Sequence, residues 1–272
     1  MEEQERQTVI TVRNVSKTFE VRSRKAETIR QRAYNLFKPG KNRKLQIQAL
    51  TDVNFEVYKG EFLGIVGHNG SGKSTLLKII MGAFPPNAGA DIQVKGKIIR
   101  LALGMGFDKT LTARDNIYVN GTVLGLTFKQ LGRKFTDILE FAELEKFVDT
   151  PLKFFSSGMR SRLAFAIAMH TEADIYLMDE FFGGVGDVGF MQKSDHVFQD
   201  RILQGRTIVH VSHQLRILKK HADRIIWLEK GQIKEIGTPE DILPRYKKEY
   251  LKEKRKKKKK KFGEELLDLE DV

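Results

Sequence analysis

The chain has 272 residues, of which 40% are hydrophobic and 31% are charged, a composition that is ordinary for a globular protein. Its apolar stretches are far shorter than the roughly 18 residues that a membrane span requires, and its first ten residues lack a signal-peptide pattern. We therefore expect a cytosolic chain, or one that reaches a membrane through another component. The absence of cysteine excludes disulfides and thiolate metal sites.

The net charge of +13 is concentrated in two segments. Residues 20–49 carry a net charge of +7 and residues 247–272 carry +4, so the rest of the chain carries only +2. Each segment could face an anionic partner, such as a membrane surface.

Strands and a basic insertion are expected before residue 67. Alternating apolar residues predict a strand over 9–21, and residues 47–66 read as two further strands joined by a Lys-Gly turn. In the insertion between them, apolar side chains at i, i+4, i+7 and i+8 predict a short basic amphipathic helix that ends at Pro39-Gly40; they are Ile29, Ala33, Leu36 and Phe37. This helix could pack on its own β layer or lie on anionic lipid headgroups, where these side chains and adjacent cations would give peripheral attachment only.

The stretch GHNGSGKST, residues 67–75, fits the phosphate-loop pattern GxxxxGK[ST]. It follows a predicted buried strand and opens a predicted helix over 73–84, which is the context that this motif requires. Backbone N–H groups of such a loop wrap nucleotide phosphates, Lys73 would reach the β and γ phosphates, and Ser74 would supply a hydroxyl to Mg²⁺. The nucleotide-binding candidates are Gly67, His68, Asn69, Gly70, Ser71, Gly72, Lys73, Ser74 and Thr75.

The chain after the phosphate loop alternates between strands and helices. Residues 85–99 are turn-rich and then strand-like, residues from 112 to 170 are mostly helical in pattern, and Thr112 with Asp115 form a plausible capping pair. Short buried strands follow in ADIYLMDE, TIVHVSH and the hairpin-like RIIWLEKGQIKEIG. This alternation predicts an α/β fold with a parallel sheet and a helical insert, and no internal repeat is visible.

Two of these strands end in residues that could carry chemistry. The apolar run 175–178 ends in Asp179, which would hold Mg²⁺, and Glu180, which would act as the general base toward the attacking water. His213 follows another buried strand and could hydrogen-bond the γ-phosphate. Each pattern is also compatible with an ordinary strand end, and the upstream phosphate loop favours the functional interpretation.

Taken together and in this order, the motifs resemble those of the ATP-binding subunits of ABC transporters. GHNGSGKST looks like the Walker A motif, IYLMDE like Walker B, His213 like the switch histidine, and FSSGM at 155–159 like the signature motif. The resemblance runs from about residue 8 to 245. It implies an ABC-type P-loop NTPase with a β-rich N-terminal layer, a RecA-like parallel-sheet core and a helical subdomain over about 109–165, followed by a charged tail at 246–272.

The resemblance also implies a second copy of the chain, ATP and Mg²⁺. In this family the signature motif of one subunit completes the ATP site of the other, a role that would fall to Ser156, Ser157 and Gly158. Donors at the N-terminus of the following helix would then meet the γ-phosphate across a dimer interface. Phe19 corresponds to the aromatic residue that stacks on adenine, and Asp187 to the D-loop aspartate.

Within the family, FSSGMRSRLAF, LTARDNIYVNGTVLGL and the segment 211–233 resemble the branch that exports cell-surface polymers. The resemblance implies a teichoic acid first and an O-antigen or another polysaccharide second. The substrate would be a polymer on a polyprenyl diphosphate lipid, which passes through a separate polytopic permease, and the chain would sit peripherally on the cytoplasmic face of the membrane.

Three departures from the family pattern stand out. The Q-loop glutamine has no counterpart in IIRLALGMGFDKTL, a long insertion follows Phe19, and the segment DEFFGGVGD holds one extra residue before Asp187.

Two other functions fit parts of the sequence. A soluble ABC protein acting on nucleic acid would suit the lysine-rich tail, but the chain lacks a second cassette, a long coiled coil and aromatic residues within the lysine run, so a nucleic-acid partner is not expected. A switch that binds ATP without turnover is disfavoured by Glu180. The lysine run at 252–261 is by default solvated, although it could touch lipid, and Leu266, Leu267 and Leu269 could form a short docking helix.

Overall fold

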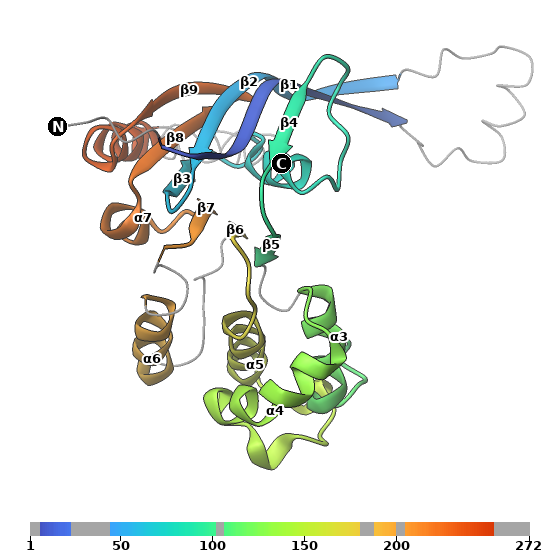
Figure 1. Ribbon diagram of the computed structural model, residues 1–272. Coiled ribbons are helices and arrows are strands. Elements are labelled where there is room, and N and C mark those ends of the chain that lie inside the picture. The colour runs from blue at the N-terminus through green and yellow to red at the C-terminus, as the bar shows by residue number, and fades with distance from the viewer. Residues whose placement is uncertain (1–5, 23–43, 102–105, 180–187, 200–204, 253–272) are drawn as a thin grey trace, which may run out of the picture.

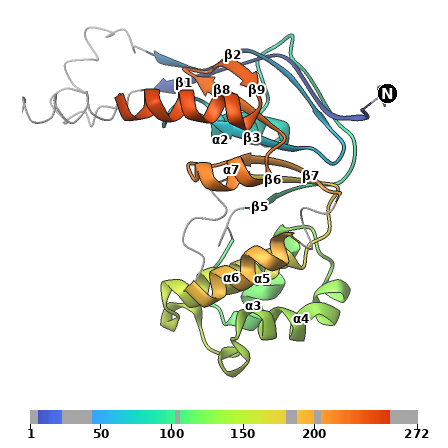
Figure 2. The ribbon, with the colours of Figure 1, turned by 90° about the vertical axis from the view of Figure 1, so that its left-hand side faces the viewer.

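A computed structural model of the protein describes residues 6–22, 44–101, 106–179, 188–199 and 205–252. Its elements form two tiers, with two β-sheets in the upper part of Figure 1 and a group of helices below them (Figure 1). The same division is visible after a quarter turn, where α5 and α6 lie beside one another in the lower tier (Figure 2). The predicted α/β architecture is therefore confirmed.

The larger sheet has six strands in the order β5-β6-β7-β3-β8-β9. Its members are β3 (Phe62–Val66), β5 (Ile98–Leu101), β6 (Ile175–Asp179), β7 (Thr207–Val211), β8 (Arg224–Glu229) and β9 (Gln232–Gly237). All neighbours run parallel except β8 and β9, which form the predicted antiparallel hairpin. The central strands β3 and β7 are buried at every residue, because a parallel sheet is covered on both faces.

The smaller sheet has the order β2-β1-β4 and is antiparallel. It contains β1 (Thr8–Arg22), β2 (Lys44–Tyr58) and β4 (Asp91–Val94). The pairing of β1 with β2 continues to Arg22 opposite Lys44, so the two ends of the predicted insertion 20–49 are strand residues. The amphipathic helix predicted around Ile29 lies outside the described residues.

Side-chain caps mark the start of three of the following helices, α3, α4 and α5. The helices are α2 (Lys73–Ile80), α3 (Ala113–Val123), α4 (Phe128–Ala142), α5 (Ser157–Met169), α6 (Val188–Phe198) and α7 (Leu215–His221), with 3₁₀ turns η1 (Glu145–Phe147) and η2 (Leu152–Phe154). The predicted capping pair of Thr112 and Asp115 is confirmed, since the two residues form a reciprocal capping box at the start of α3. Helix α2 ends at Ile80, earlier than predicted, and Gly82 turns the chain there with a φ of 73°.

Buried side chains form two hydrophobic clusters, one on each face of the large sheet. One cluster joins the small sheet and α2 to residues of β3, β6 and β7. The other joins the opposite faces of these strands to α3, α4, α5 and α6. None of the helices in the described part of the chain combines the length and apolar composition needed to cross a bilayer.

A last helix, residues 239–252, follows β9 and is capped by Thr238, whose hydroxyl accepts a hydrogen bond from the backbone N–H of Asp241. Tyr246 on this helix is 3% exposed and belongs to the second cluster. The predicted boundary between domain and tail at residue 246 therefore falls inside a helix that packs on the sheet.

The buried His210 on β7 predicts a loss of stability in acid. Burial lowers the pKa of His210 to about 3, because no water solvates a charged imidazole at this position. In the unfolded chain His210 has an ordinary histidine pKa of about 6.5 and binds a proton below that pH, whereas in the folded chain it stays neutral. The free energy of unfolding therefore falls as the pH drops below about 6.5. Between pH 7.5 and pH 5 this group alone should cost about 2 kcal/mol.

Urea unfolding at these two pH values checks this expectation. A His210→Leu variant should lose about that much less stability than the parent over the same pH interval. An identical loss in parent and variant would show that His210 has the same pKa in the folded and the unfolded chain.

Candidate functional site

Three neighbouring parallel strands bring the predicted site residues to one edge of the large sheet. Strands β6, β7 and β3 are adjacent and run in the same direction, so their carboxyl ends meet at the same edge. Asp179 is the last residue of β6, His213 follows β7, and the phosphate loop follows β3. The structure thus brings Asp179, His213 and the phosphate loop to one edge of the sheet.

The phosphate loop requires glycine for two separate reasons. Gly70 and Gly72 have φ values of 81° and 103°, which L side chains rarely adopt. Gly67 approaches the β8 backbone so closely that a Cβ atom there would lie 2.2 Å from the carbonyl oxygen of Leu228. The loop is fixed from outside by the backbone N–H of Gly231, which donates to the carbonyl of Ser71 at 3.0 Å.

Lys73 and Ser74 lie at the start of α2, where the free N–H groups and the helix dipole favour an anion. The Nζ atom of the buried Lys73 donates to the carbonyls of Gly67 and His68 at 2.7 and 2.9 Å. This places the ammonium group inside the loop, where phosphate oxygens could replace the two carbonyls as its hydrogen-bond acceptors. The hydroxyl of Ser71 is also buried, and within the described residues it has no hydrogen-bond partner.

Ser74 and Asp179, the predicted magnesium ligands, meet although they are distant in sequence. The Ser74 hydroxyl donates to Oδ1 of Asp179 at 3.5 Å. Hydroxyl and carboxylate oxygens are donors that Mg²⁺ prefers, and Mg²⁺ is typically held by one or two carboxylates together with substrate phosphates. No cluster of three or more metal-ligating His, Asp or Glu side chains occurs among the described residues, so these two residues with the nucleotide fit Mg²⁺ better than a metal held by protein alone.

A cation that the motifs do not predict lies beside this carboxylate. Arg100, on β5, donates from Nη2 to Oδ2 of Asp179 at 2.9 Å, and both side chains are mostly buried, with 17% and 15% of their areas exposed. The sequence does contain a signal for this ion pair. Arg100 lies within the short apolar strand Ile98–Leu101, and a charged side chain in such a strand needs an acidic partner.

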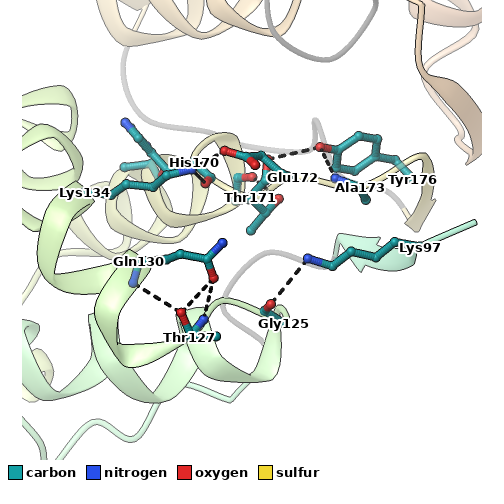
Figure 3. Close-up of polar contacts among 12 residues, drawn as sticks. Lys97, Gly125, Thr127, Gln130, Lys134, His170, Thr171, Glu172, Ala173 and Tyr176 are labelled. Atoms are coloured by element: carbon teal, nitrogen blue, oxygen red, sulfur yellow. Dashed lines mark hydrogen bonds and ion pairs between the residues drawn. The ribbon is translucent and has the colours of Figure 1, made fainter.

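Strand β6 is held at its other end by contacts to the helical tier (Figure 3). The Tyr176 hydroxyl donates to the carbonyl of Thr171 and accepts from the N–H of Ala173, both at 3.1 Å. Lys134 of α4 binds the carbonyl of His170 at 2.9 Å and the carboxylate of Glu172 at 2.7 Å. The strand that carries Asp179 is therefore anchored to both tiers.

His68 and His213 lie near the helix at residues 239–252. The His68 ring stacks on Tyr250 with a centroid distance of 5.3 Å and an interplanar angle of 15°, and Tyr246 lies 6.0 Å away. A pocket of about 230 Å³ is lined by His213, Leu215, Tyr246, Lys247, Tyr250 and Leu251. This helix is not among the predicted elements, although two signals indicate it, namely the capping pair at its start and the spacing of its apolar residues 242, 243, 246 and 250.

The signature segment stands apart from the phosphate loop of its own chain. Ser156 caps α5 by accepting a hydrogen bond from the N–H of Met159 at 3.1 Å, and α5 lies in the lower tier (Figure 1). Within the described residues, no hydrogen bond joins Ser156, Ser157 or Gly158 to the phosphate loop. The helix begins at Ser157.

The remaining predicted residues are not all placed. Phe19 packs edge-on against Phe84 at 5.6 Å and lies 5.3 Å from Nζ of Lys17, so its stacking on adenine stays a prediction. Glu180 and Asp187 lie outside the described residues.

Known proteins are similar in sequence to this chain over most of its length. The family model described as ABC transporter matches residues 50–183. The chain is 41% identical over 202 residues to the O-antigen export system ATP-binding protein RfbB of Myxococcus xanthus, a match that covers 74% of this chain and 46% of the relative. It is 37% identical over 237 residues to the teichoic acids export ATP-binding protein TagH of Listeria monocytogenes, covering 87% and 69%.

A solved structure shares the fold. It is a dimeric ATP-binding cassette in a post-hydrolysis state bound to ADP and phosphate, with a TM-score of 0.64 and 23% identity, covering 85% of this chain and 98% of that one. This chain spans less than half of the length of the Myxococcus protein that it matches.

Proposed function

Because this chain belongs to the family of ATP-binding subunits of ABC transporters, we propose that it drives export of a lipid-linked cell-surface polymer through a separate membrane permease. The observation that carries the proposal is the match of 87% of the chain to a protein named for teichoic acid export, with a phosphate loop of the required geometry at the matched position. The chain would act at the cytoplasmic face of the membrane, attached through the permease.

Each site residue has a role in ATP hydrolysis under this proposal. The loop and Lys73 bind the phosphates, while Ser74 and Asp179 hold Mg²⁺, which would neutralise charge that develops on the transferred phosphoryl group. Glu180 accepts a proton from the attacking water, and His213 donates a hydrogen bond to the γ-phosphate. The separation of Ser156 from the loop of its own chain supports a role in the site of a second copy.

The polymer is the finer part of the proposal. We favour a teichoic acid on a polyprenyl diphosphate lipid, because that match covers more of this chain than the O-antigen match does. An O-antigen or another polysaccharide is the alternative. Depleting the chain in its source cells should cause lipid-linked polymer to accumulate on the cytoplasmic side of the membrane. Chemical analysis of that polymer would decide between the two classes.

Isolation of the full chain from detergent-solubilised membranes tests the proposal. We expect recovery with one polytopic membrane protein in equal amount, and polymer-linked lipid should raise the ATPase rate of that complex. Recovery with ribosomes or DNA, without a membrane protein, would instead support the nucleic-acid function that the lysine-rich tail would suit.

A further inference from the structure

We propose that Arg100 is the counter-cation of Asp179. Its guanidinium neutralises this carboxylate while no metal is bound, and the ion pair breaks when Mg²⁺ binds with the nucleotide. Arg100 is thus a positioning residue of the ATP site, and the inference rests on the magnesium role proposed for Asp179. The starting observation is that one carboxylate has two partners, with Oδ1 facing Ser74 and Oδ2 paired with Arg100.

The need for a counter-cation follows from burial. Asp179 is 15% exposed, and an ionised carboxylate with so little water requires a nearby positive charge. The ammonium of Lys73 is held by two loop carbonyls instead. Arg100 reaches Asp179 because β5 pairs with β6 in parallel, which brings residues 79 positions apart in sequence within 2.9 Å.

The geometry of the contact indicates that it can be released. Arg100 uses one nitrogen, Nη2, and its buried Nε has no hydrogen-bond partner among the described residues. A pair held by one hydrogen bond lacks the fork-like contact that makes arginine–carboxylate pairs strong and rigid.

Another arginine in the same sheet shows what a fixed pair looks like. Arg224, the first residue of β8, binds both carboxylate oxygens of Glu61 and also donates to the carbonyl of Glu56 at 2.7 Å. This pair lies at the amino end of the parallel strands, opposite the nucleotide edge. Arg224 therefore serves as a matched control for a half-buried ion pair without a role at the site.

Electrostatics gives the sign of the expected effect. Without Arg100, the site carries one more negative charge, which repels the phosphates of a metal-free nucleotide and attracts Mg²⁺. Both changes make nucleotide binding depend more strongly on the metal. A purely structural role for Arg100 would instead weaken binding with and without the metal alike.

The test measures binding of the non-hydrolysable ATP analogue adenylyl imidodiphosphate to the full chain by calorimetry, in excess Mg²⁺ and in excess EDTA. The readout is the ratio of the dissociation constant in EDTA to that in Mg²⁺. We expect Arg100→Met and Arg100→Gln to raise this ratio at least about tenfold, chiefly by weakening metal-free binding. Arg100→Lys should stay within about threefold of the parent, since the charge is kept.

Arg224→Met should lower the melting temperature and leave the ratio unchanged. If Arg100→Met does not fold, Arg100→Gln, which keeps a hydrogen-bond donor, carries the measurement. An unchanged or lower ratio in the folded variant overturns the inference and leaves the proposed function intact. A parent whose binding is the same in Mg²⁺ and EDTA overturns both the inference and the magnesium role of Asp179.

Discussion

Replacing Glu180 with glutamine is expected to abolish ATP turnover and to trap two copies of the chain as a nucleotide-bound dimer. Glutamine keeps the size and hydrogen-bonding capacity of the side chain but cannot accept a proton from water. A positioned base contributes about 10²- to 10⁴-fold to a rate, so phosphate release should fall by that factor. In the sequence, Glu180 directly follows Asp179, the last residue of β6.

Light scattering with ATP and Mg²⁺ would detect the dimer, and phosphate release would report turnover. Glu172→Gln is a matched control, because Glu172 precedes the same strand at its opposite end and pairs with Lys134. That variant should hydrolyse ATP at the rate of the parent. Turnover by Glu180→Gln at the parental rate would contradict the role of Glu180 as general base. A variant that stays monomeric with ATP would contradict the proposed role of Ser156 in the ATP site of a second copy.

Replacing Gly72 with alanine is expected to weaken ATP binding on the order of a hundredfold. The φ of 103° at Gly72 is unfavourable for alanine, and a Cβ there would lie 2.6 Å from the carbonyl oxygen of Ala49 and 2.7 Å from Cδ2 of Leu50. The carbonyl of Ala49 belongs to the backbone and cannot move aside as the end of a flexible side chain can, so the loop must shift. A misplacement of about 1 Å in a functional site can cost about a hundredfold in function, and we expect a loss of that order in ATP affinity.

The matched control is Gly60→Ala, at a residue that also has a positive φ, 76°, but has no atom within 4 Å of the added Cβ. It should cost about 1 to 2 kcal/mol of stability through backbone strain alone and leave ATP affinity unchanged. Calorimetric titration with ATP and thermal unfolding of both variants would separate strain from displacement of the loop. Equal ATP affinities in the two variants would show that the contact with Ala49 is relieved without moving the loop.

Most of the phosphate loop was predictable because its chemistry is local. The order Gly67 to Ser74 predicts which backbone groups and which side chains would surround a phosphate, and the structure confirms the strand before the loop and the helix after it. Asp179 was predictable for a related reason, since an apolar run that ends in an acid indicates the end of a buried strand.

Other parts of the site could not be obtained from local patterns. Hydrophobic periodicity identifies a strand but gives no information on which strand lies beside it, so the pairing of β5 with β6, and with it the contact of Arg100 with Asp179, was not predicted. The stacking of Tyr250 on His68 likewise depends on where the last helix docks.

The sequence by itself determined which residues are candidates for nucleotide binding, because the motifs depend on spacing along a few consecutive residues and on strand ends that apolar runs mark. Only the tertiary structure decided the neighbours of these residues, namely the arginine on the Asp179 carboxylate, the tyrosines against His68 and the distance of Ser156 from its own loop. The physical reason is that strand order and helix docking are set by burial of surfaces far apart in the chain, which no short stretch of sequence encodes.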